Sequence, residues 1–240
     1  MAILRRYGLF VLIWGAFFSL AFWAAPNRAE EDLLMLQKAL RQIEEWDSYT
    51  VSQTMTVGGR KESEVRVISH QNPYLAHVES KVRLTDDEDF TFEAYFQPEA
   101  IYVYTPSNKA WTKTDYTHPA AGELEGVKHP GDLWLRLLAH TAHITRTETK
   151  EGRIVFSLQL RPFREEINGF SISDVQTAKL EAWLTPNPPR VEKVKLTTFF
   201  KPNILRGYNE MIYENHFSAI NQAPDIYLPM EAYTFRKINK

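Results

Sequence analysis

Residues 43–57 read IEEWDSYTVSQTMTV, and within this stretch the spacing of apolar residues changes from that of a helix to that of a strand. Upstream, leucines and then Ile43 recur every three or four residues, which predicts an amphipathic helix over 29–46. From Tyr49 onward apolar and polar residues alternate, which predicts a strand over 49–57. One face of this strand carries Tyr49, Val51, Met55 and Val57.

Short alternating segments separated by turn signals continue through most of the chain. Turns are expected at Gly58-Gly59, Asn72-Pro73 and Pro98-Glu99, a spacing typical of an antiparallel meander. A second helix is expected over 132–143, and residues 161–178 are either a flap or a surface segment packed by its own side chains. The fold class predicted is α+β. Further strands are expected over 64–70, 74–84, 90–96, 100–105, 111–114, 144–148, 153–160, 179–184, 191–200 and 210–220.

The N-terminal region contains an apolar run, YGLFVLIWGAFFSLAFWAA, over residues 7–25. A helix of this length nearly spans the roughly 30 Å hydrocarbon core of a bilayer. Arg5 and Arg6 precede the run, which places the N-terminus in the cytoplasm and the rest of the chain outside. The bulky residues expected to hold this helix in the membrane are Trp14, Phe17, Phe18 and Trp23.

A cleavable signal peptide has the same charge order as such an anchor. Cleavage favours small residues at the last and third-last positions, but Phe22 and Trp23 occupy the third-last position for cleavage after Ala24 and Ala25. The interpretation favoured is an uncleaved anchor over 1–28 followed by one extracytoplasmic domain over 29–240. If the segment is cleaved, the domain is secreted.

Composition excludes several classes of function. The chain has 28 basic and 30 acidic residues, which argues against a broadly basic nucleic-acid binder. It has no cysteine, and therefore no disulfide, thiolate metal site, cysteine nucleophile or lipid-modified cysteine. No nucleophile elbow, P-loop or dinucleotide-binding glycine motif occurs. We expect a binding protein and not an enzyme, with no catalytic residue, metal or cofactor.

Two segments are similar to a known superfamily. In one, IEEWDSYT over 43–50 leads from the helix directly into a strand; in the other, AWLTP over 182–186 is followed by a returning strand from Pro189 to Leu196. These resemble the bacterial lipoprotein- and lipid-carrier superfamily that includes LolA, LppX-type carriers and RseB. The resemblance implies a half-barrel, in which a strongly curved antiparallel sheet wraps around helices and encloses an apolar cavity.

Aromatic and aliphatic residues of the central region are the candidates for that cavity. In one interpretation they form its wall and a closing lid; in the other they are ordinary core residues that pack sheet against helix. The wall candidates are Phe90, Phe92, Phe96, Tyr102 and Trp111, and the lid candidates are Trp134, Leu137 and Leu138.

Two functions remain open from the sequence. The first is a membrane-anchored extracytoplasmic protein that holds a lipid, an acylated protein or another apolar ligand, since each CH₂ group buried contributes about 0.8 kcal/mol. The second is a regulatory or assembly protein of the same fold that docks an envelope or spore-wall protein without transporting lipid. The first predicts a bound lipid after purification, and the second predicts a stoichiometric protein partner.

Overall fold

The computed structural model describes residues 28–107, 109–117, 129–167, 169–203, 207–234 and 236–237. The expected membrane segment, with its two arginines, lies outside these residues. Within the described ranges, no helix is both long enough and apolar enough to cross a bilayer.

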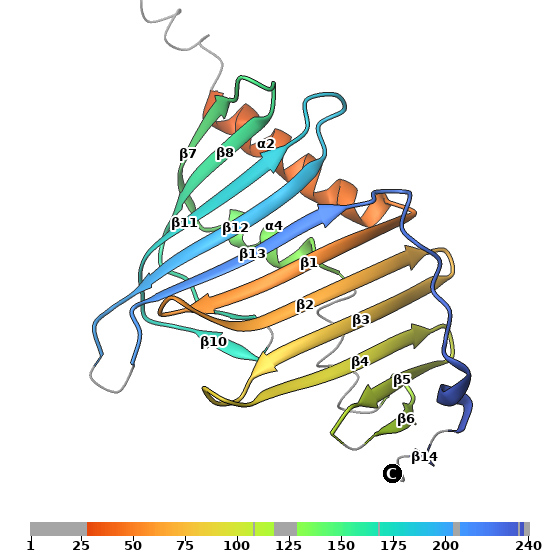
Figure 1. Ribbon diagram of the computed structural model, residues 1–240. Coiled ribbons are helices and arrows are strands. Elements are labelled where there is room, and N and C mark those ends of the chain that lie inside the picture. The colour runs from red at the N-terminus through yellow and green to blue at the C-terminus, as the bar shows by residue number, and fades with distance from the viewer. Residues whose placement is uncertain are drawn as a thin grey trace, which may run out of the picture.

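The described chain forms one twelve-stranded sheet (Figure 1), in the order β14-β6-β5-β4-β3-β2-β1-β13-β12-β11-β8-β7. Neighbouring strands run antiparallel, apart from the parallel pair β14 and β6. The strands are β1 (Ser48–Val57), β2 (Arg60–Gln71), β3 (Tyr74–Arg83), β4 (Asp89–Gln97), β5 (Ala100–Thr105), β6 (Ala110–Thr114), β7 (Thr141–Glu148), β8 (Ile154–Leu160), β11 (Val175–Leu184), β12 (Val191–Phe200), β13 (Glu210–Ser218) and β14 (Arg236–Lys237).

Two meanders build this sheet and meet in its middle. Strands β1 to β6 run outward from the centre to one edge, whereas β7, β8, β11, β12 and β13 return from the opposite edge. The halves join where β13 pairs with β1, from Thr50 opposite Ser218 to Val57 opposite Met211. The sheet stays open, with β7 and β14 as its edge strands. The predicted α+β fold with a curved, mainly antiparallel sheet is confirmed.

Two helices lie on one face of the sheet (Figure 1), which we call the inner face. The first, α2 (Arg28–Arg41), continues into a 3₁₀ turn, η1 (Gln42–Glu45), and the second is α4 (Asp132–Leu138). Leu36, Leu40 and Ile43 of the first helix and its turn are fully buried, as their helical spacing predicts. Trp134 and Leu137 of α4 are also fully buried, so the two helices close the core over the β7–β13 half.

Two expected boundaries are wrong. The second helix ends at Leu138 instead of His143, because the Thr141 hydroxyl caps the Leu138 carbonyl at 2.7 Å and residues from Thr141 onward pair with β8 as strand β7. The excursion over 161–178 contains a small hairpin, β9 (Glu165–Ile167) and β10 (Phe170–Ile172), and its end already belongs to β11. Pairing of β7 with β8 sets the first boundary, and the excursion is shaped by its own short hairpin and by the start of β11.

The C-terminal segment crosses to the other face of the sheet. It leaves β13 through a hydrogen bond of 2.6 Å from Asn221 N–H to the Ser48 carbonyl, and the Pro224 carbonyl lies 2.9 Å from His70 Nε2. It then forms a 3₁₀ turn, η2 (Met230–Thr234), beside β5 and β6 (Figure 1), and β14 follows at the sheet edge. A second, smaller apolar cluster forms there, made of Tyr95, Ala100, Tyr102 and Ala232 with Trp111, Ile226 and Leu228 around them.

All secondary-structure elements and both apolar clusters of the described chain lie between Arg28 and Lys237.

Candidate functional site

Two buried amides lie side by side at the centre of the inner face. Gln53 of β1 is directly opposite Asn215 of β13 in the strand register, and the two side chains are 2% and 1% exposed. Their neighbours in the same cross-strand row are apolar: Val194 on one side and Val65 on the other. Such polar groups are costly to bury unless hydrogen bonds satisfy them, so this pair calls for an explanation.

The two amides differ in how well they are satisfied. With its amide oriented to suit its surroundings, Asn215 accepts a hydrogen bond from Trp134 Nε1 at 3.2 Å and donates to the Tyr213 hydroxyl and the Glu214 carbonyl. Gln53 Oε1 is fully buried and has no hydrogen-bond partner among the residues that the structure describes. Asn215 therefore ties α4 to the sheet, whereas Gln53 keeps an unused acceptor.

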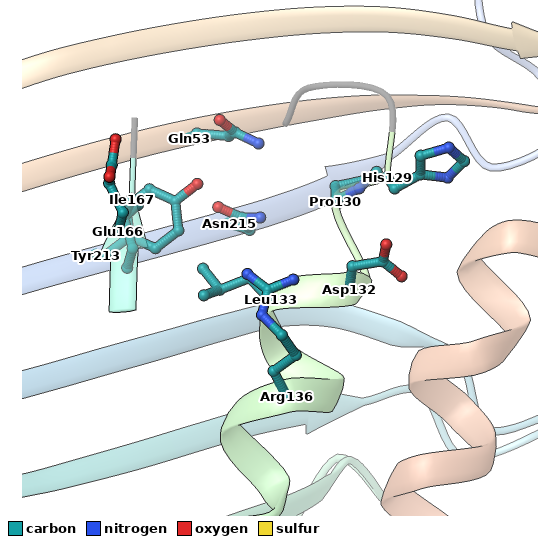
Figure 2. A pocket seen from close by; sticks show the side chains of 10 residues that line it. All are labelled: Gln53, His129, Pro130, Asp132, Leu133, Arg136, Glu166, Ile167, Tyr213 and Asn215. Carbon is teal, nitrogen blue, oxygen red and sulfur yellow. The ribbon is translucent and has the colours of Figure 1, made fainter. Parts of the chain in front are cut away.

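A cavity of about 250 Å³ lies above this pair. Figure 2 shows it between the sheet, the start of α4 and the β9–β10 hairpin. In this view the amides of Gln53 and Asn215 lie next to each other, with Asp132, Leu133 and Arg136 of α4 on the facing side. The lining residues are Gln53, His129, Pro130, Asp132, Leu133, Arg136, Glu166, Ile167, Tyr213 and Asn215.

Acidic side chains outnumber basic side chains around the cavity. Arg136 is held by Glu165, with Nε 3.3 Å from Oε1 and Nη2 3.3 Å from Oε2, and His129 Nδ1 lies 2.8 Å from Glu44 Oε2. The carboxylates of Asp132 and Glu166 take part in no ion pair within the described ranges. Arg136 and His129 at the cavity each contact a carboxylate, whereas Asp132 and Glu166 contact no basic side chain of the described chain.

From the amide pair, the cross-strand row continues toward β4 with two apolar side chains and one serine. The row that contains Gln53 continues through Val65 of β2 and Ser80 of β3 to Phe92 of β4. Phe92 is half-buried, and its neighbour Phe90, 6.0 Å away between ring centroids, is 37% exposed. The inner face therefore runs from a polar centre to an apolar, partly exposed end.

The structure brings some of the sequence-predicted residues together and separates others. Phe90, Phe92 and Phe96 share the inner face of β4. Tyr102 and Trp111 lie on the opposite face, because Tyr102 pairs with Tyr95 and Trp111 with Tyr104, and the C-terminal segment packs there. The register of β4, β5 and β6 separates the two sets, which the sequence analysis grouped by proximity along the chain.

The lid candidates are buried in the main core. Trp134 and Leu137 are fully buried, and Leu138 is 6% exposed. The Trp134 ring stacks on Tyr213 with centroids 5.5 Å apart. This packing fits the alternative interpretation of these residues, in which α4 covers the sheet.

Gln53 and Asn215 were missed by the sequence analysis. A signal existed for Gln53: it occupies an inward position in the alternation of β1, between two buried apolar residues, Val51 and Met55. A polar residue at an inward position indicates either a buried hydrogen-bond network or a ligand contact.

The outer face has a polar cluster of its own. Glu93 Oε1 accepts a hydrogen bond from the Tyr95 hydroxyl at 2.7 Å and lies 2.8 Å from His77 Nε2, while the His77 ring stacks on Tyr95 at 4.3 Å. Burial and the bond to Glu93 raise the pKa of Tyr95. The polar groups of this cluster bond to one another. Tyr95 also belongs to the apolar cluster on which the C-terminal segment packs.

The described residues contain no group of three or more His, Asp or Glu side chains that could hold a metal ion. His140 and His143, which the predicted helix would have placed on one face, instead lie before and within strand β7.

Comparisons with known proteins assign no function to this chain. A family model described as a family of unknown function (DUF6612) matches residues 32–122. Among curated proteins none matches this chain.

Two solved structures align with most of the chain. The Mycobacterium tuberculosis lipoprotein LppX aligns at 13% identity with a TM-score of 0.49, covering 81% of this chain and 97% of that one. An uncharacterised conserved protein from Thermus thermophilus aligns at 10% identity with a TM-score of 0.41, covering 88% and 99%.

Proposed function

We propose that this protein binds an amphipathic ligand, a lipid or an acylated protein, on the inner face of its sheet. The ligand's polar end would occupy the cavity over Gln53 and Asn215, and its apolar chain would follow the inner face toward Phe92 and Phe90. The observation that carries the proposal is a cavity over the two buried amides, Gln53 and Asn215, on an inner face that leads to the half-buried Phe92 and the exposed Phe90.

The setting that we propose is the outer side of a cell membrane. The apolar run over 7–25 and the arginines before it support an anchor that leaves residues 29–240 outside. Such an anchor would keep the domain within reach of membrane lipids. We propose binding and release of the ligand without chemical conversion.

The test is native mass spectrometry of residues 28–240, purified without detergent and exposed to a bacterial lipid extract. We expect a species heavier by the mass of one lipid. Phe90→Glu should remove this species, because a charge at the apolar end of the path opposes chain binding. Phe199→Glu is the matched control, since Phe199 is 43% exposed on the outer face of β12. Equal lipid binding by both variants would contradict the proposed path.

A second candidate function is docking of an envelope protein. The C-terminal segment exposes three large apolar side chains: Tyr227 at 77%, Met230 at 84% and Tyr233 at 64%. Exposed apolar groups of this kind are typical of contact surfaces. Crosslinking of the membrane-bound full chain should capture one protein in equal amount, and Met230→Asp should abolish the capture; a lipid-bound chain without such a partner would favour the first function.

A further inference from the structure

We infer that a second pocket, on the outer face of the sheet, binds a zwitterionic group that contains an ammonium and a phosphodiester, as a phosphoethanolamine head group does. The pocket has a volume of about 220 Å³ and lies where the start of β2, the end of β3 and the start of β4 come together. Its lining residues are Lys61, Glu62, Ser63, Glu64, Lys81, Arg83 and Asp89. This inference goes beyond the proposed function, because it concerns the face opposite to the proposed lipid path.

The alternation of the strands places this pocket on the outer face. Val65, Ser80 and Phe92 form one row of the inner face. Glu64 is one position before Val65, Lys81 is one position after Ser80, and the two pair across the strands. Because successive side chains of a strand point to opposite faces, Glu64 and Lys81 point outward.

A β-bulge at Glu62 shapes the pocket. On the neighbouring strand β1, Met55 is opposite Ser63 and Thr56 is opposite Lys61, so Glu62 is an extra residue of β2. A bulge breaks the regular alternation and turns a side chain toward a new direction. Four consecutive residues of β2, over 61–64, therefore line the same pocket.

Most charges at the pocket satisfy one another. Lys61 Nζ lies 3.1 Å from Glu64 Oε2, and Lys81 Nζ lies 2.8 Å from Asp89 Oδ2. The lining contains three basic and three acidic side chains in all, so its formal charge is zero. Such a lining gives no net attraction to a ligand that is only an anion or only a cation.

The two remaining charges, Glu62 and Arg83, are opposite in sign, and neither takes part in an ion pair within the described ranges. Both side chains are half-buried, where a charge without a partner is costly. Arg83 is directly opposite Asp89 in the strand register, but Asp89 pairs with Lys81 instead. The pocket therefore offers a ligand one carboxylate and one guanidinium.

A ligand with both charges matches this arrangement. A guanidinium donates two parallel hydrogen bonds to a phosphate, and a carboxylate accepts hydrogen bonds from an ammonium. The pocket volume is below the roughly 300–1,000 Å³ of sites that enclose a drug-sized ligand, so it suits a group of head-group size. A lipid or a soluble glycerol ester can each supply such a group.

The test is isothermal titration calorimetry of the full chain in dodecyl maltoside micelles near neutral pH, with three soluble probes. Glycerophosphoethanolamine contains both charges, glycerophosphoglycerol contains only the negative charge, and ethanolamine contains only the positive charge. We expect glycerophosphoethanolamine to bind at least about tenfold more tightly than either other probe. Equal binding of a probe with one charge, or no binding of any probe, would overturn the inference.

Two variants test the two ends of the ligand separately. Arg83→Gln should remove the advantage of glycerophosphoethanolamine over ethanolamine, and Glu62→Gln should remove its advantage over glycerophosphoglycerol. The matched controls are Arg66→Gln and Glu79→Gln, which break an ion pair of 3.4 Å between residues that do not line the pocket. Both controls should bind the probes as the unmodified protein does, and circular dichroism should show all four variants folded. Folded pocket variants that bind like the controls would overturn the inference.

A competition experiment identifies the source of the group. Phosphatidylethanolamine in the micelles should displace glycerophosphoethanolamine if a lipid supplies the group, whereas phosphatidylglycerol at the same mole fraction should not. Failure of phosphatidylethanolamine to displace the probe would assign the pocket to a soluble zwitterion with the same chemistry, and equal displacement by both lipids would overturn the inference. The proposed function is tested independently by Phe90→Glu on the inner face, so its failure and the failure of this inference are distinguishable.

Discussion

The two halves of the sheet bury the same face with different side chains. In the β7–β13 half, beneath α2 and α4, the inner face carries large groups such as Phe156, Leu180 and Leu196, and Trp134 of α4 packs onto them. In the β2–β6 half, the inner face carries the small Val78 and Ala94 beside the larger, buried Phe96 and Ile101. Helices α2 and α4 cover the first half, whereas the inner face of the second half ends at the half-buried Phe92 and the exposed Phe90.

The amide pair lies at the seam between these halves. Gln53 belongs to the outgoing meander and Asn215 to the returning one, and their strands pair directly. We interpret the helix-covered half as the part that provides stability, and the seam with the adjoining half as the part that binds. Changes in the two halves should therefore differ in what they disturb.

The largest effect on stability is expected in the helix-covered half. Trp134→Ala removes a fully buried ring and its bond to Asn215, and should lower the free energy of unfolding by about 3–5 kcal/mol in urea titration. Phe92→Ala in the other half should lower it by less than half as much, because Phe92 is only half-buried. An equal loss in both variants would remove the distinction between the halves.

The next effect concerns Asn215 at the seam. Asn215→Ala leaves the Trp134 indole N–H and the Tyr213 hydroxyl without this buried partner. The free energy of unfolding should fall by about 1–3 kcal/mol, plus a smaller contribution from lost packing. Thermal unfolding followed by circular dichroism measures this. A loss below 0.5 kcal/mol, as an order of magnitude, would mean that the amide does not tie α4 to the sheet.

Replacing Gln53 should change the free energy of unfolding in the opposite direction. Without ligand, Gln53→Met removes a buried acceptor that has no partner in the described chain, so the free energy of unfolding should rise by up to about 1 kcal/mol. Thr198→Val should raise it similarly. Calorimetry of the lipid-free fragment provides the measurement. Destabilisation by Gln53→Met alone would show that the Gln53 amide has a structural role.

The smallest effect is expected at the cavity rim. Arg136 is 54% exposed in its side chain, so its ion pair with Glu165 should contribute less than about 1 kcal/mol. Glu165→Gln should therefore leave urea unfolding almost unchanged, and the change should shrink further in high salt. A loss above 2 kcal/mol, roughly the scale of a buried pair, would show that the β9–β10 hairpin depends on this contact.

Strong periodicity explains why most of the fold could be predicted. Strand β12 was expected at the bounds observed, 191–200, because apolar alternation and the preceding prolines mark it. The end of α4 could not be predicted, since the sequence from Ala139 to His143 has no glycine or proline, and pairing of β7 with β8 sets the boundary.

The candidate site was harder to predict because it depends on register. Gln53 and Asn215 are 162 positions apart by number, and only the pairing of β1 with β13 brings them together. Likewise, Tyr102 and Trp111 are close in sequence to Phe96 but face the opposite side, which only the paired strands fix. The alternation within each strand indicates which positions point inward, but only pairing between distant strands brings the residues of the site together.

The most direct test of the account is native mass spectrometry of the lipid-exposed fragment 28–240 as the unmodified protein, Phe90→Glu and Phe199→Glu. We predict one bound lipid in the unmodified protein and in Phe199→Glu, and at least a tenfold smaller bound fraction in Phe90→Glu, because Phe90 lies at the exposed end of the inner face and Phe199 is exposed on the outer face. A bare protein mass throughout, or equal lipid binding in all three proteins, would contradict the claim that a lipid binds along the inner face.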